Sequence, residues 1–548
     1  MPRRGQVGSY AREVFIQQSN RRFVYVTLMT SQIIRILRFD RAGCYYTQPI
    51  YYHKDSVSFV KFVLLLSSLN EELLGFGTSI SWIAGQRVMK MTPPELFNHT
   101  KQRWEPNTAE LIFTLADQPM FSRRTIRSRG TVCWIAKHAG QEYVIKDYWR
   151  ADGRAHESAF LKDFVGVKGV GQMFAFNDER DSIKAGRGFG EQEIMTSDAQ
   201  SKCVLNRWFM RLVLPQYGDT LEKATSASHL LCAVRDIVRG HRDSLVLKGI
   251  LHRDISFTNL LLSFHETHGV VIDWDLAKEM EKVIQDQGID DDSRTGTRAY
   301  QSVKVLNGSS DLGHHDNMDD LESIFYVLYH VLFGHDTSGN PVHFEALGQI
   351  ADWQNIVTRP PLLAKSKQYF LEKGVRQHIT RYTSPDEQTL AALMKELQRF
   401  FRPRMGSIDA ALDDDEEHID FPKYDQQEAA GRYEAFISII DQAILKLPEV
   451  LPAPAPPSPN GSVGSTKRSR TEDESNECAS KRTRTQRVRA TKAPISSYVD
   501  PDDSDDDDEP PPSPTDAGYD PKGSKCKIAV WVRARRAGRG RSRAGSFK

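Results

Sequence analysis

A short polar motif in the middle of the chain constrains its fold more than any other feature of the sequence. The stretch Leu251-His252-Arg253-Asp254-Ile255-Ser256-Phe257-Thr258-Asn259 places a carboxylate and an amide five residues apart, directly after a long amphipathic helical pattern from about Ser226 to Lys248. Phosphoryl transfer needs a carboxylate that orients the attacking hydroxyl and accepts its proton, and an amide oxygen that holds a metal ion against the phosphates. The spacing therefore predicts a catalytic role for Asp254 and a metal- and nucleotide-binding role for Asn259.

The residues around this motif follow in the order that such a site requires. Fourteen residues after Asn259, the apolar pattern Val270-Val271-Ile272 ends at Asp273, which we predict to bind the metal ion and the nucleotide. Upstream, a second apolar pattern ends at Lys146, a cation suited to the α- and β-phosphates, and Glu157 is its expected ion-pair partner in catalysis. Because each of these residues alone has an ordinary structural explanation, the prediction depends on their joint order.

In this order and spacing the chain resembles the fungal-type protein kinase family, a divergent branch of the eukaryotic protein kinase superfamily. The resemblance covers roughly residues 21–447. It implies a two-lobed α+β fold of the protein-kinase type, use of ATP and Mg²⁺, and transfer of the γ-phosphoryl group to a protein hydroxyl, with Ser/Thr specificity. The stretches that carry it are Phe39-Asp40-Arg41-Ala42-Gly43, Gly75-Phe76-Gly77, Val144-Ile145-Lys146-Asp147-Tyr148-Trp149-Arg150, Ile250-Leu251-His252-Arg253-Asp254-Ile255-Ser256 and Asp319-Asp320-Leu321-Glu322-Ser323.

Other residues are expected to support or adjoin the motif. His252 and Arg253 are assigned to structural support of the catalytic loop, and Asp320 is the expected buried carboxylate that braces it. Thr297 is predicted at the substrate-docking end of the activation segment. The pair His314-His315 is expected on a surface loop, because no carboxylate or cysteine at metal-ligand spacing accompanies it.

Hydropathy and composition divide the chain into four parts. Residues 1–121 are expected to form an N-terminal β-meander and helix, with strands near 23–26, 33–37 and 50–52 and a helical pattern over 56–74. The remaining parts are a kinase N-lobe with an insertion loop over 122–217, a C-lobe over 218–450 and a disordered tail over 451–548. The tail is predicted from its proline-rich start, basic clusters and acidic run, which offer too little apolar surface to offset the entropy of ordering.

Two glycine patterns bear on the nucleotide. A loop that covers the phosphates is expected before Lys146, but Ser128–Trp134 offers only Gly130, which we assign to nucleotide binding because it permits close backbone approach. The glycine-richer stretch Gly186-Arg187-Gly188-Phe189-Gly190 lies after Glu157 in the chain, on the wrong side for this role. We therefore interpret it as a flexible insertion loop.

Ser256 is the departure with the largest consequence for chemistry. Most Ser/Thr kinases carry a lysine at this position, and loss of one preorganised donor lowers a rate by about 10²–10³. Against kinase turnover of roughly 1–100 per second, this predicts a slow enzyme. A pseudokinase that acts as a nucleotide-binding or scaffolding module is the alternative, although it leaves the intact metal ligands unexplained. A small-molecule kinase shares the Asp-x₄-Asn spacing but would not be expected to keep His-Arg-Asp.

Composition indicates where such a protein acts. Six scattered cysteines, the lack of a signal peptide and the lack of a long apolar run predict an intracellular protein of the nucleus or cytoplasm that does not interact with membranes. The clusters Lys467–Arg470 and Lys481–Arg484 resemble a bipartite signal for a nuclear import receptor. Binding of nucleic acid by the Arg-rich terminus is the less favoured interpretation, since only Trp531 offers an aromatic platform nearby. The sequence does not name the protein substrate.

Overall fold

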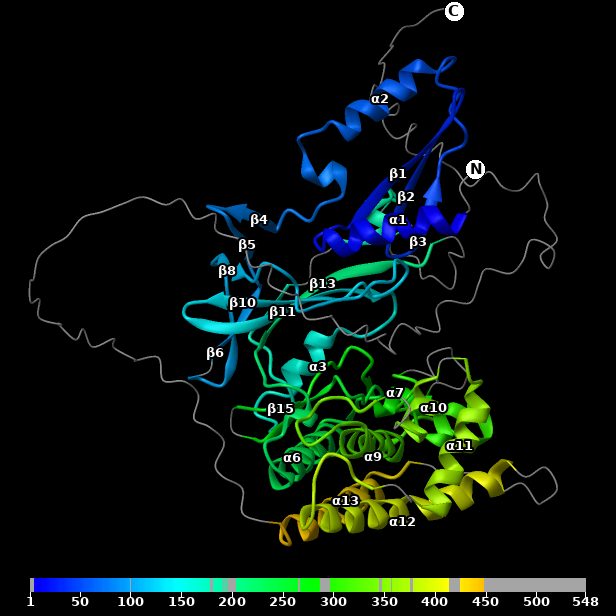
Figure 1. The fold of residues 1–548 in the computed structure, drawn as a ribbon. Helices are drawn as coiled ribbons and strands as arrows, with labels where there is room; N and C mark the ends of the chain where they lie inside the picture. The colour runs from blue at the N-terminus through cyan, green and yellow to red at the C-terminus, as the bar shows by residue number, and fades with distance from the viewer. Residues whose placement is uncertain are drawn as a thin grey trace, which may run out of the picture.

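The computed structural model describes residues 4–447, with gaps at 99, 178–180, 191, 193, 195–203, 265–266, 286–295, 344–346, 356, 375–377 and 413–423. The described residues form a mixed α and β structure in which a large antiparallel sheet separates a small N-terminal region from a helical part (Figure 1). The predicted tail, 451–548, lies outside the described residues. In the part that is described, no helix is long and apolar enough to cross a membrane.

The N-terminal region contains the predicted β-meander, with one strand in a different place. After helix α1 (Arg4–Gln17), which the sequence analysis did not predict, strands β1 (Phe23–Met29), β2 (Ile34–Asp40) and β3 (Gly43–Tyr46) form a three-stranded antiparallel sheet. A third strand was expected near residues 50–52, but the third strand of the sheet is β3, because the chain turns back at Gly43 and pairs at once with β2. Ile50 forms only an isolated antiparallel bridge with Ile34. The helical signal over 56–74 is divided into α2 (Ser56–Leu66) and the 3-10 turn η1 (Glu71–Leu74).

The large sheet runs across residue 121, where the sequence analysis had divided the chain. Its strands follow the order β4-β5-β8-β10-β11-β13-β12-β6-β7, with β9 paired to β10. Strands that precede residue 121 therefore share one hydrogen-bonded sheet with the strand that carries Lys146. The strands are β4 (Ile80–Ile83), β5 (Gln86–Met91), β6 (Glu95–Asn98), β7 (Arg103–Pro106), β8 (Leu111–Leu115), β9 (Phe121–Ser122), β10 (Val132–His138), β11 (Gln141–Ala151), β12 (Ala175–Asn177) and β13 (Arg207–Pro215).

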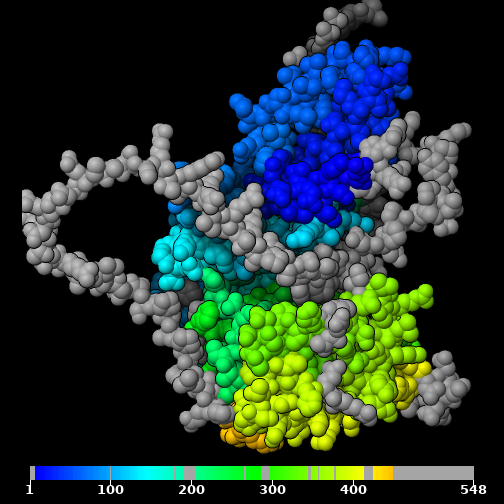
Figure 2. Space-filling view, viewed as in Figure 1, coloured from blue at the N-terminus to red at the C-terminus, as the bar shows by residue number. Residues whose placement is uncertain are grey.

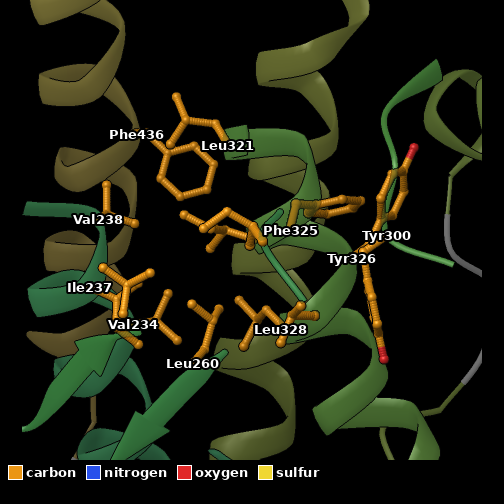
Figure 3. Packing of buried hydrophobic residues seen from close by; sticks show 14 of the residues in the cluster. Val234, Ile237, Val238, Leu260, Tyr300, Leu321, Phe325, Tyr326, Leu328 and Phe436 are labelled. Carbon is orange, nitrogen blue, oxygen red and sulfur yellow. The ribbon is translucent and has the colours of Figure 1, made fainter. Parts of the chain in front are cut away.

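Helices dominate the part of the chain that follows β13, and they enclose the main hydrophobic core. Helix α9 is buried along its whole length, and Figure 3 shows its Leu321 beside Phe436 of α13. In Figure 2 this part lies on the side of the sheet opposite the N-terminal region. The helices after β11 are α3 (Glu157–Asp163), α4 (Ile183–Gly186), α6 (Ala227–Val246), α7 (Met280–Gln285), α8 (Val303–Asn307), α9 (Asn317–Gly334), α10 (Gln349–Gln354), α11 (Pro360–Lys373), α12 (Asp386–Leu412) and α13 (Gln426–Ile444), with 3-10 turns η2 (Leu221–Lys223) and η4 (Ser310–Leu312).

Two short antiparallel ladders hold the predicted catalytic loop. The loop runs from β14 (Ile250–Leu251) to β15 (Leu260–Leu262), which pairs with β16 (Gly269–Val271), while β14 pairs with β17 (Lys278–Glu279). Helix α6 packs directly against this hairpin. The two are so close that a Cβ atom at Gly269 would collide with the backbone of Ala233 on α6. The absence of that side chain lets the helix fix the hairpin, and with it the ends of the strands from which Asn259 and Asp273 project.

Candidate active site

Asp254 is nearly buried and its side chain is held in one orientation. The backbone N–H and the hydroxyl of Thr297 both donate to Asp254 Oδ1, at 2.9 and 3.1 Å. The amide of Asn259 donates to the backbone oxygen of Asp254 at 2.9 Å. Thr297, predicted at the docking end of the activation segment, thus lies directly against the predicted catalytic carboxylate. Residues 286–295 of that segment lie outside the described residues.

Asn259 and Asp273 are brought together by the β15–β16 hairpin. The N–H of Ile272, the residue before Asp273, donates to the backbone oxygen of Asn259 at 2.9 Å. Since the Asn259 side-chain nitrogen is used by Asp254, its side-chain oxygen is the atom left to accept or to ligate. Asp273 has a φ of 65°, a conformation that non-glycine residues adopt rarely and mostly where a site requires it.

Lys146 lies between two carboxylates. Its Nζ is 2.7 Å from Glu157 Oε2 on α3 and 2.6 Å from Asp273 Oδ1. Burial alone would lower the pKa of Lys146, but Asp273 and Glu157 outweigh burial and raise the pKa well above its usual value. Burial, together with the neighbouring acids, raises the pKa of Glu157 to about 7 although Lys146 opposes the shift. Lys146 is therefore a permanent cation at this site.

Glu157 also connects the sheet to the residue after Asp273. Its second oxygen, Oε1, accepts a hydrogen bond from the backbone N–H of Trp274 at 3.0 Å. The Trp274 ring is fully buried, with ring centroids 4.4 Å from Phe164 and 4.6 Å from His252. One side chain thus ties together β11, α3 and the segment that follows β16.

Asp320 braces the catalytic loop from the start of α9. Its Oδ2 accepts the backbone N–H of Arg253 at 3.0 Å and His241 Nε2 at 2.9 Å, and its Oδ1 accepts His315 Nε2 at 2.9 Å. Burial by itself would raise the pKa of Asp320, but His315 and His241 hold it well below the usual range. The expectation that His315 lies on a loop surface was wrong, because its side chain is only 6% exposed and is bound to Asp320.

His252 and Arg253 adopt the conformation that this bracing requires. The N–H of Asp254 donates to His252 Nδ1 at 3.2 Å, so His252 Nε2 is the nitrogen that donates to Ile272 O at 3.0 Å. Burial lowers the pKa of His252 to about 4, although Asp320 opposes the shift, and the ring is therefore neutral near pH 7. Arg253, with a φ of 70°, turns the chain so that Asp254 follows in place.

Gly130 makes its close approach to the N-terminal region. Its φ is 56°, and a Cβ atom there would collide with the guanidinium of Arg41, which lies in the turn after β2. Arg41 Nη1 also donates to Thr125 O at 2.9 Å. The structure thus explains this glycine by the packing of Arg41, while its assignment to nucleotide binding stays a prediction.

The glycine-rich stretch after α4 is attached to the same turn. Arg187 donates from Nε and Nη2 to the two carboxylate oxygens of Asp40, at 2.8 and 2.6 Å, and the Arg187 side chain is only 10% exposed. The stretch 186–190, which we interpreted as a flexible insertion loop, is therefore anchored at its second residue. A bidentate pair between residues so distant in sequence left no signal in the local pattern.

The sequence analysis missed two ion pairs at the site, that of Lys146 with Asp273 and that of Arg129 with Asp275. Arg129, in the segment before β10, lies with Nη1 2.5 Å from Oδ1 of Asp275, two residues after Asp273. Ser256, at the position where a lysine was expected, has its hydroxyl 3.3 Å from that of Thr258. No local pattern joins Arg129 to Asp275, because they are 146 residues apart.

The side chains at the site suit a magnesium ion that is shared with phosphates. Asn259 and Asp273 offer amide and carboxylate oxygens, which are the ligands that Mg²⁺ prefers. Within the described ranges, no three His, Cys, Asp or Glu residues gather in a way that could hold a metal ion by themselves. This agrees with Mg²⁺ sites in which one or two protein oxygens act together with substrate phosphates.

One comparison with known proteins places the chain. The family model described as fungal protein kinase matches residues 2–332. That range is more than half of the 548 residues and includes the β-meander, Lys146, Asp254, Asp273 and Asp320. No curated protein matches the sequence.

Proposed function

Because this chain belongs to the fungal protein kinase family, we propose that it transfers the γ-phosphoryl group of ATP to a hydroxyl group of a protein in a Mg²⁺-dependent reaction. The observation that carries the proposal is the convergence of five residues from separate elements. Lys146 and Glu157 come from the sheet and α3, and Asp254, Asn259 and Asp273 come from the strand ends below them.

ATP would bring the transferable group, and Mg²⁺ would neutralise charge on its phosphates. Asn259 and Asp273 would hold the metal ion through their side-chain oxygens. Lys146, kept charged by Glu157, would bind the phosphates as a cation. Asp254, held by Thr297, would orient the attacking hydroxyl and accept its proton.

We also propose that the sheet and the helical part are the two lobes of a kinase fold. The chain leaves the sheet after β13, and Gly218 N donates to Leu262 O at 2.9 Å, so this connection is tied to β15. The active-site residues come from both sides of this connection, which supports nucleotide binding between the two parts.

Ser or Thr is the proposed acceptor, and transfer is proposed to be slow. The contact of Thr297 with Asp254 supports Ser/Thr specificity, since the acceptor has to reach the same carboxylate. Ser256 supports slow transfer, because the lysine that usually accompanies the catalytic aspartate is absent. Ser256 also favours the second candidate function, a pseudokinase that binds nucleotide or partners without transfer.

Phosphate transfer from labelled ATP to the protein itself and to a generic basic protein would test the proposal. Wild type is compared with Asp254→Asn and Asp273→Asn, and with Asp311→Asn, an exposed change, as the matched control. The expected result is Mg²⁺-dependent transfer by wild type and control that both site variants abolish. Mg²⁺-dependent ATP binding without transfer would establish the pseudokinase instead, and absence of binding would refute the nucleotide site. Phosphoamino-acid analysis of the product would test Ser/Thr specificity.

For the cell, we propose nuclear import through the tail. The basic clusters Lys467–Arg470 and Lys481–Arg484 would bind an import receptor, and they lie outside the described residues. The test is the cellular location of the fluorescently labelled full chain after the one lysine and two arginines of each cluster are replaced by alanine. Nuclear accumulation that persists after both replacements would refute the proposal.

A further inference from the structure

Ser256 provides no positive charge beside the catalytic carboxylate, where most Ser/Thr kinases carry a lysine. The residue is buried, and its hydroxyl faces that of Thr258 at 3.3 Å. In the proposed reaction, negative charge on the transferred group has to be balanced by preorganised donors or cations near Asp254. A serine hydroxyl cannot supply that positive charge, so another residue has to supply it if transfer occurs.

Arg129 lies in the segment that would cover the phosphates. Its backbone oxygen accepts the N–H of Trp149 at 2.7 Å, which continues the pairing of β10 with β11 beyond Val132. The segment is therefore fixed along the strand that carries Lys146. Arg129 extends from it across the site to Asp275, at 2.5 Å, and its side chain is 15% exposed.

The charge of Arg129 is felt by the metal-binding carboxylate. Burial by itself would raise the pKa of Asp273, but Lys146 and then Arg129 lower it below the usual range. Two cations thus face Asp273, one from β11 and one from the phosphate-covering segment. Asp275 is the residue that holds the second cation there.

We propose that Arg129, anchored by Asp275, supplies to the phosphates of bound ATP the positive charge that Ser256 omits from the catalytic loop. The inference rests on the proposed kinase function and deepens it. Arg129 forms and breaks no covalent bond; it stabilises charge on the phosphoryl oxygens, while the proton of the acceptor hydroxyl passes to Asp254. A guanidinium suits this task because it is always charged and has several donors in one plane.

Nucleotide binding by the full-length protein is the first test. Calorimetric titration with ATP, ADP and adenosine in Mg²⁺ compares wild type, Arg129→Ala and Arg129→Lys. The matched control is Arg124→Ala, an exposed arginine of the same segment. We expect Arg129→Ala to weaken ATP binding by about tenfold and to leave adenosine binding unchanged, as loss of a charged hydrogen bond predicts. Arg129→Lys and the control should remain close to wild type, and equal melting temperatures would exclude a folding defect.

The second test asks whether a lysine at position 256 restores the kcat that is lost in Arg129→Ala. Arg129→Ala should lower kcat by about 10²-fold, the usual effect of losing one preorganised donor. Adding Ser256→Lys to Arg129→Ala should recover at least tenfold, because the lysine restores the charge at its usual position. ATP affinity and kcat within twofold of wild type in Arg129→Ala would overturn the inference.

The two proposals can fail separately. Loss of transfer in Asp254→Asn with no effect of Arg129→Ala would retain the kinase and remove the role of Arg129. Wild type that binds ATP without transfer still tests Arg129 through its affinity. Wild type that neither binds nor transfers would refute both.

Discussion

Two clusters in this protein both consist of basic and acidic side chains in contact. They differ in how fully the positive charges balance the negative charges. The scaffold cluster, at the start of α9, consists of Lys304, Asp316, Asp319 and Arg404. Both cations contact both carboxylates at 2.8–3.1 Å, and every side chain is at most 10% exposed. Two positive and two negative charges are thereby neutralised inside the helical part.

The active-site cluster consists of Lys146, Glu157, Asp273, Arg129 and Asp275. Two cations face three carboxylates, and the Asp273 side chain is 27% exposed. A site with an excess negative charge and an accessible carboxylate is suited to receive a divalent cation, whereas the scaffold cluster needs nothing further. Both clusters contain buried charged residues. The balance of positive and negative charge, and the exposure of a carboxylate, therefore distinguish a ligand-binding cluster from a structural one.

The largest expected effect is the breaking of the scaffold cluster by Arg404→Met. The change leaves two buried carboxylates with one cation, and we expect the free energy of unfolding to fall by about 3–5 kcal/mol. Urea denaturation followed by circular dichroism measures it. Arg402→Met, an exposed change on the same helix, is the matched control and should alter stability by no more than about 0.5 kcal/mol. Equal stability of the two variants would contradict the comparison.

Lys146→Met should produce the opposite pattern in the active-site cluster. Transfer is expected to fall by about 10²–10³ or more, because a preorganised cation is lost from the phosphates. Stability should change less than in Arg404→Met, since Asp273 is partly exposed and Glu157, with a pKa of about 7, can take up a proton. Kinetics and urea denaturation on the same preparation measure both. A stability loss as large as that of Arg404→Met would show that Lys146 is mainly structural.

Two buried neutral histidines outside these clusters should make the stability of the protein sensitive to acid. Burial lowers the pKa of His330 to about 3 and that of His252 to about 4, below the value of about 6.5 in an unfolded chain. The unfolded state therefore binds more protons below about pH 6.5, and the free energy of unfolding should fall by about 1.4 kcal/mol per pH unit for each histidine between roughly pH 6 and pH 4. Urea denaturation at several pH values measures the slope.

His330→Gln should remove one of these two contributions and make the slope shallower. His53→Gln, a change at an exposed histidine, is the control and should leave the slope unchanged. An unchanged slope in His330→Gln would mean that other groups cause the acid sensitivity.

The smallest expected effect is that of magnesium without nucleotide. If the excess charge of the active-site cluster attracts Mg²⁺, millimolar MgCl₂ should stabilise wild type by up to about 1 kcal/mol, which corresponds to a few degrees in Tm. Asp273→Asn should lose the shift, and Arg404→Met should keep it. A shift that persists in Asp273→Asn would place the metal ion elsewhere.

The sequence predicted those parts of the site that are written in local patterns. The apolar runs that end at Lys146 and Asp273 correspond to β11, which continues past Lys146 to Ala151, and to β16, and the spacing of Asp254 and Asn259 predicted the loop between β14 and β15. The buried carboxylate at Asp320 was predicted from its place in the order of kinase motifs, at the start of a helical pattern. Such features depend on the alternation of one segment, which the sequence itself records.

Local patterns failed where the packing of neighbouring segments selects the partner, even when that partner is close in the sequence. The tight turn after Asp40 pairs Gly43–Tyr46 with β2, whereas Ile50 forms only an isolated bridge with Ile34 at the start of that strand. His315 was expected on a loop surface, but its hydrogen bond with Asp320 holds its side chain in the interior.

The sequence by itself determined the family, the order of the chemical groups and the identity of the residues that carry them. Only the tertiary structure decided that Arg129 meets Asp275, that Arg41 packs against Gly130 and that His241 and His315 share Asp320. The physical reason is that periodicity specifies which face of an element is buried, whereas the choice of partner depends on how distant segments are placed by the packing of the whole core.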